Sequence, residues 1–213
     1  MSAMLSDTTV SLLLTTAAGL ATLHTLIGID HSLPFVALGR ARGWTLRRTL
    51  WVTALCGLVH VASSVAIGAI GIGLGVALDQ LSWLESTRGR FAAWLMVGFG
   101  LAYAAWAVWR GEHRSHGHAA RPTTWALFLI FAFGPCEALI PLMMVPAAEG
   151  AWAVLGAVVV VFGAGTIGAM LLAVTVGYVG AGWFRLPNLH ARADLLAGLV
   201  VAASGAGVLF LGL

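Results

Sequence analysis

The stretch His24-Thr25-Leu26-Ile27-Gly28-Ile29-Asp30-His31 determines how this chain is interpreted. It places two imidazoles and one carboxylate inside an apolar segment long enough to cross a membrane. Ionisable groups in bilayer hydrocarbon are costly, so they are rarely found there without a function. Imidazole and carboxylate are also ligands of divalent transition metals. The stretch therefore predicts a polar, metal-binding site within a membrane span.

The composition indicates an integral membrane protein. The chain has 213 residues, of which 60% are hydrophobic and 9% are charged, whereas soluble domains contain about 25% charged residues. All 11 basic residues are arginines, and they flank apolar segments. The placement of these arginines therefore indicates membrane topology. The net charge of +3 is poor evidence for nucleic acid, which is not an expected partner.

Six segments are apolar and long enough to span a bilayer, which requires about 20 residues. We expect an all-α protein with a single transmembrane domain over residues 1–213 and the lipid bilayer as its surroundings. The predicted spans are residues 10–38, 49–78, 91–109, 124–147, 151–180 and 194–213.

Arginines follow the first, third and fifth predicted spans. They are Arg40, Arg42, Arg47 and Arg48, then Arg110, Arg114 and Arg121, and finally Arg185 and Arg192. The second-to-third connection carries Arg88 and Arg90 beside acidic residues, and the fourth-to-fifth carries only Glu149. The positive-inside rule predicts that the odd-to-even connections are cytoplasmic and that both termini face outward.

Six spans divide naturally into two halves of three, and the second half then inserts with inverted topology. Transporters built in this way have interrupted helices at matching places of the two halves. Gly28 and Pro34 predict such a break in the first span, and Gly134 and Pro135 predict one in the fourth, because proline and glycine weaken a helix interior. We therefore expect a 3+3 inverted repeat.

The spacing of the histidines requires the first break. On a straight helix His24 and His31 would lie about 10.5 Å apart along the axis, and Asp30 would point to another side. Metal–nitrogen bonds of about 2.0–2.1 Å do not suit that separation. A metal site here therefore predicts a bent chain near Gly28.

Further candidate ligands lie in other spans. His60 lies in the second, and the hydroxyls of Ser63 and Ser64 follow one turn later, where they could orient its imidazole. The alternative for His60 is a buried histidine bonded to a serine or a carbonyl. Cys136 and Glu137 follow the fourth-span break, and Cys136 could equally be a small apolar filler.

A short histidine-rich tract with His113, His116 and His118 lies in the third-to-fourth connection. Such tracts can collect metal ions, although a few histidines at an interface can also simply be solvated.

The first-span block resembles the hydrogenase and urease accessory permeases (HupE/UreJ). The residues that carry the resemblance are His24, Gly28, Asp30, His31 and Gly39. The family has proline where this chain has Thr25. Gly57 and His60 with the following serines are similar to a motif of the nickel/cobalt transporters. Gly134-Pro135-Cys136 is similar to an element of the wider superfamily that includes lysine exporters and thiol-redox membrane proteins.

The resemblance implies a permease of the bacterial inner membrane that translocates nickel or cobalt, with zinc or iron as alternatives. It implies that His24, Asp30 and His31 are the metal ligands. From the polar residues of the other spans we expect His60, Glu137 and Cys136 to complete the site. A transporter of this kind is not an enzyme. Its expected partners are the metal ion and either a second copy of the chain or a metallochaperone.

Two other functions fit parts of the sequence. Cys56 and Cys136 could form the redox pair of a membrane thiol–disulfide electron carrier, although this leaves the histidines unexplained. The same metal ligands could serve an intramembrane hydrolase with Glu137 as its base, although the chain has no His-Glu-x-x-His motif.

Overall fold

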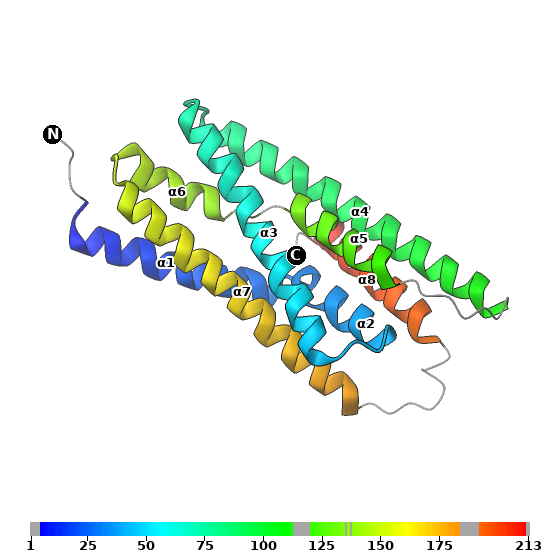
Figure 1. Ribbon diagram of the computed structural model, residues 1–213. Helices are drawn as coiled ribbons and strands as arrows, with labels where there is room; N and C mark the ends of the chain where they lie inside the picture. The colour runs from blue at the N-terminus through cyan, green and yellow to red at the C-terminus, as the bar shows by residue number, and fades with distance from the viewer. Residues whose placement is uncertain (1–4, 113–119, 135, 137, 184–191, 212–213) are drawn as a thin grey trace.

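The chain folds into an elongated bundle of helices (Figure 1). The computed structural model describes residues 5–112, 120–134, 136, 138–183 and 192–211, and this part of the chain contains no strand. Its helices are α1 (Asp7–Ile27), η1 (Ile29–His31), α2 (Leu33–Ala41), α3 (Leu46–Gly73), α4 (Leu78–Glu112), α5 (Ala120–Phe133), α6 (Leu139–Ala148), α7 (Trp152–Trp183) and α8 (Ala193–Leu211).

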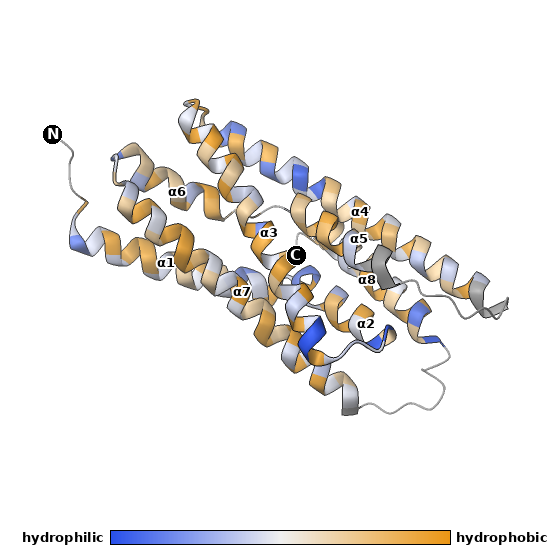
Figure 2. Cartoon of the chain, in the orientation of Figure 1, coloured by the Kyte–Doolittle hydropathy of each residue, from blue (hydrophilic) through white to orange (hydrophobic). Residues whose placement is uncertain are grey.

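Five of these helices, α1, α3, α4, α7 and α8, are long and apolar enough to cross a membrane. Large apolar side chains such as Trp51, Val160 and Val176 are more than 60% exposed on them. Figure 2 shows the apolar character along all the helices. The expectation of an all-helical fold is confirmed for the described residues, and their five long apolar helices fit a transmembrane protein.

The first predicted span is interrupted in the middle. Helix α1 ends at Ile27, and Gly28 adopts an extended conformation (φ −68°, ψ 98°) before the single turn η1. Helix α2 then begins with Pro34 in its first turn, where the missing N–H of proline would have no partner within the helix. The predicted span 10–38 is therefore α1 followed by α2.

The fourth predicted span is also divided. Helix α5 ends at Phe133 and α6 begins at Leu139, and each is shorter than the roughly 20 residues needed to cross a bilayer. Gly134 and Cys136 lie between them without helical structure. Pro135 lies outside the described residues.

The helix that contains the third predicted span begins well before residue 91. Helix α4 starts at Leu78 and runs for 35 residues, so it is about 50 Å long and exceeds the membrane core of about 30 Å. Figure 2 shows hydrophilic positions along its first half. Glu85 and Arg88, expected in a loop, therefore belong to this helix.

The core consists of two clusters of buried apolar residues. One includes Phe35, Leu38, Cys56, Leu127, Met170 and Val201. The other includes Ala17, Ala21, Val61, Cys136, Leu139 and Phe162. Along α3, His60 lies between Cys56 of the first cluster and Val61 of the second. The polar residues of the site therefore lie at the level where the two clusters meet.

Candidate metal-binding site

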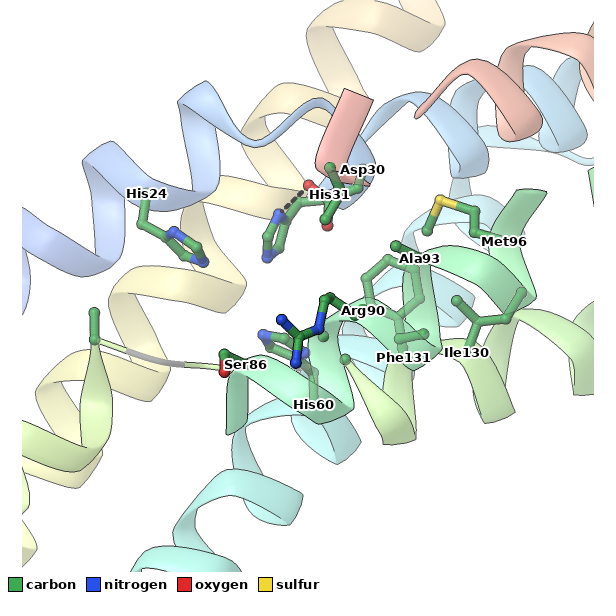
Figure 3. Close-up of a pocket in the computed structure, with 15 residues that line it drawn as sticks. His24, Asp30, His31, His60, Ser86, Arg90, Ala93, Met96, Ile130 and Phe131 are labelled. Carbon is green, nitrogen blue, oxygen red and sulfur yellow. Dashed lines mark hydrogen bonds and ion pairs between the residues drawn. The ribbon is translucent and has the colours of Figure 1, made fainter. Parts of the chain in front are cut away.

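Three histidines meet beside the break in the first span. His24 is in the last turn of α1, where its carbonyl accepts the N–H of Gly28 at 2.9 Å, and His31 ends η1. His60 comes from α3. The ring centre of His31 lies 5.0 Å from that of His24 and 5.4 Å from that of His60 (Figure 3). The bend between α1 and α2 thus brings together the two histidines that a straight helix would separate.

Asp30 orients one of these imidazoles. Nδ1 of His31 and Oδ1 of Asp30 are 2.9 Å apart, so the ring donates to the carboxylate. This contact leaves Nε2 of His31 as the nitrogen that can accept a proton or a metal ion, an arrangement common among metal-bound histidines. A Cβ on Gly28 would lie 2.6 Å from Nδ1 of His31 and 2.9 Å from Oδ1 of Asp30. The pair therefore needs glycine at this position.

Ring nitrogens of all three histidines are buried without a hydrogen-bond partner. They are Nε2 of His24, Nε2 of His31 and both nitrogens of His60. The residues His31 and His60 are only 3% and 2% exposed. Buried polar atoms are nearly always paired in native proteins. These nitrogens are therefore free to bind something that the protein itself does not supply.

The histidines line a cavity of about 570 Å³ together with Asp30. Ser86 and Arg90 of α4 also lie on its wall, and Figure 3 shows the Arg90 side chain among the residues around the cavity. The ring of Phe131 in α5 packs edge-on against His31 and His60, with centres 6.4 and 6.2 Å away. The site is thus an apolar chamber with a few polar groups, as ligand sites usually are.

The donor atoms do not yet converge on one point. In the part of the chain that is described, no group of three His, Cys, Asp or Glu side chains is placed to hold a metal ion. The imidazoles instead stand nearly edge to face, with interplanar angles of 77° and 88°. Ligand binding would require these rings to turn toward one another.

The serines after His60 do not contact its imidazole. The hydroxyl of Ser63 donates to the backbone carbonyl of His60 at 2.9 Å, and that of Ser64 donates to Oε2 of Glu85 at 3.1 Å. The sequence-based role of these hydroxyls, to orient the imidazole, is therefore not what the structure gives. For Ser64 the physical reason is the nearby carboxylate of Glu85, which binds a hydroxyl more strongly than a neutral ring nitrogen does.

Sequence reasoning missed a buried ion pair between Glu85 and Arg88 of α4. Glu85 is fully buried and also accepts the N–H of Cys136 at 3.1 Å. A carboxylate and a guanidinium three residues apart lie on one helix face, and this spacing was the available signal.

Arg88 ties α4 to the end of α5. Its Nη2 donates to the carbonyls of Ala132 and Gly134, at 3.1 and 3.5 Å, and to the hydroxyl of Ser63 at 3.0 Å. These carbonyls belong to the last turn of α5 and the residue after it, where no helical partner is available. Arg88 thus holds the second break in place. This break lies beside the histidines, because a Cβ on Gly134 would lie 3.0 Å from Nδ1 of His60.

The two cysteines are free and buried in different apolar clusters. Cys136 is fully buried, and it is not among the residues that line the cavity. Glu137, Pro135 and the tract His113, His116 and His118 lie outside the described residues. The structure thus brings together His24, Asp30, His31 and His60 from the predicted ligand set.

Neither family models, nor curated proteins, nor solved structures match this chain. The site is therefore interpreted from its own chemistry.

Proposed function

We propose that this protein is a membrane permease for a divalent transition-metal ion, with nickel or cobalt as the favoured substrate. The observation that carries the proposal is the group of unpartnered ring nitrogens of His24, His31 and His60 at one chamber inside the bundle. Imidazole suits nickel, copper, zinc and iron as a ligand. The carboxylate of Asp30 acts through His31 and raises the basicity of its imidazole.

The spacing of the rings supports a shared ion. Nitrogen ligands about 2.0–2.1 Å from a tetrahedral ion hold their ring centres roughly 5 Å apart. The observed separations from His31 are 5.0 and 5.4 Å, which match this spacing for the two pairs that include His31.

The proposal includes an inverted repeat, with α1 and α2 forming the first span and α5 and α6 the fourth. The packing supports this division. Helix α1 packs on α7 as α5 packs on α3, and α2 packs on α8 as α6 packs on α4. The pairs α3 with α7 and α4 with α8 are in contact as well. Exchange of the two halves therefore maps these contacts onto one another, as in transporters with a site at the repeat interface.

The test is metal binding and flux by the full-length protein. His24→Ala, His31→Ala and His60→Ala should each weaken nickel binding in nanodiscs at least tenfold and abolish nickel flux into proteoliposomes. The estimate is conservative, since even an outer partner of a metal ligand typically contributes about 10- to 100-fold to affinity. Thermal unfolding monitored by tryptophan fluorescence checks that each variant folds.

Two control variants separate the proposed site from its competitors. Joint replacement of His113, His116 and His118 by alanine should leave flux intact, and so should joint replacement of Cys56 and Cys136. Nickel flux that survives replacement of His24, His31 or His60 but is lost in the triple variant of the histidine-rich tract would contradict the proposal. Loss of activity only in the cysteine variant would favour the electron carrier instead.

A further inference from the structure

The chamber that holds the histidines also carries a cation of the protein itself. Arg90 of α4 lines the same cavity as His24, Asp30, His31 and His60. Its side chain is exposed, and its Nη2 donates to the hydroxyl of Thr87 at 3.3 Å. Among the described residues, no carboxylate lies within ion-pair distance of Arg90, since Glu85 is paired with Arg88 and Asp30 with His31.

A guanidinium at this place is unfavourable for a bare metal ion. The described charged side chains on the chamber wall are Asp30 and Arg90, so the wall offers a divalent cation no net negative charge. Arginines along a membrane pathway select for anions. An arginine inside a membrane bundle also needs water or a counter-ion. Arg90 on the chamber wall is therefore placed to bind an anion that accompanies the metal.

The size of the chamber allows such a complex. Six water molecules occupy roughly 180 Å³, at about 30 Å³ each, whereas the cavity measures about 570 Å³. A metal ion with a small organic ligand therefore fits where a hydrated ion alone would leave most of the space unused. The planar fork of arginine matches the two oxygens of a carboxylate.

We propose that the substrate is a divalent metal ion in complex with a small carboxylate-bearing chelator, with the histidines on the metal and Arg90 on a carboxylate. This inference rests on the proposed function and names the chemical form of its substrate. Arg90 is then the residue that distinguishes the complex from the bare ion.

The test is equilibrium dialysis of the full-length protein in nanodiscs of zwitterionic lipid. Nickel is presented alone or with radiolabelled citrate, at the same concentration of free Ni²⁺ in both cases. A site for the bare ion gives equal nickel occupancy in both cases. A site for the complex gives higher occupancy with citrate, and one bound citrate for each nickel.

Arg90→Gln should reduce the apparent affinity for nickel citrate about tenfold, because it removes a charge-assisted hydrogen bond. It should make binding of nickel alone tighter, because a positive charge is removed from the chamber wall. Arg47→Gln is the matched control, because Arg47 is exposed at the start of α3 and does not line the chamber. Arg47→Gln should show the same increase in nickel occupancy with citrate as the wild type.

A second variant covers the case in which Arg90→Gln does not fold. Arg90→Lys keeps the charge without the fork and should retain part of the citrate effect. Equal nickel occupancy with and without citrate in the wild type would overturn the proposal, and so would bound citrate that persists in Arg90→Gln. If the wild type binds nickel in neither form, the proposed function itself fails.

Discussion

At the scale of single residues, the site depends on the absence of a side chain at Gly28. The backbone angles there, φ −68° and ψ 98°, lie close to the extended region that other residues adopt. The restriction is therefore steric, because a Cβ would collide with the contact between His31 and Asp30. Gly28 determines where an imidazole points as well as where α1 ends.

Gly28→Ala should weaken nickel binding about tenfold, the lower range for losing an outer carboxylate partner, while the helical content stays the same. Gly19→Ala in the same helix is the control, because a Cβ there meets nothing within 4 Å. Nickel titration and circular dichroism measure the two effects. Unchanged affinity in Gly28→Ala would show that the Asp30–His31 contact does not support binding.

The sequence predicted part of this site. Glycine between two polar groups of an apolar span indicated the bend, and the costly imidazoles indicated the site. The distance between His31 and His60 could not be predicted, because it depends on how α3 packs beside the break. The same holds for Ser64, since its acceptor Glu85 is 21 residues away in sequence.

At the scale of helices, the buried pair Glu85–Arg88 links α4 to both sides of the second break. Charged residues lower the mean hydropathy of a segment, so the start of α4 looked like a loop in the sequence. The structure shows that each charge has partners inside the bundle: Ser64 and Cys136 for the carboxylate, and the end of α5 for the guanidinium. Such partners are tertiary contacts, which a hydropathy window does not detect.

Glu85→Gln should destabilise the protein by about 3 to 5 kcal/mol, because it leaves the guanidinium of Arg88 without its counter-ion. The double variant Glu85→Gln with Arg88→Met should recover part of the loss, since no unpaired charge remains. Thermal unfolding in detergent measures both. Glu149→Gln is the control, because Glu149 is exposed in the turn after α6. A single variant as stable as the wild type would contradict a structural role for the pair.

At the scale of the whole molecule, the two apolar clusters bracket a polar layer. The histidines, Asp30 and Arg90 lie around this layer, at the interface of the two proposed repeats. A site at such a level can be reached from either side if one half of the bundle moves against the other. The polar layer in the middle of the bundle therefore agrees better with transport than with a site at one membrane surface.

The orientation that the arginines predict for this bundle in the membrane can be tested directly. The connection between α2 and α3 and that between α3 and α4 lie at opposite ends of the bundle (Figure 1). In a variant without Cys56 and Cys136, a cysteine at Leu74, which is 76% exposed, should react with a membrane-impermeant maleimide in intact cells. A cysteine at the exposed Arg47 should react only after permeabilisation, because the positive-inside rule places that end in the cytoplasm. The reverse pattern would invert the orientation, and labelling of both positions in intact cells would contradict a membrane-spanning α3.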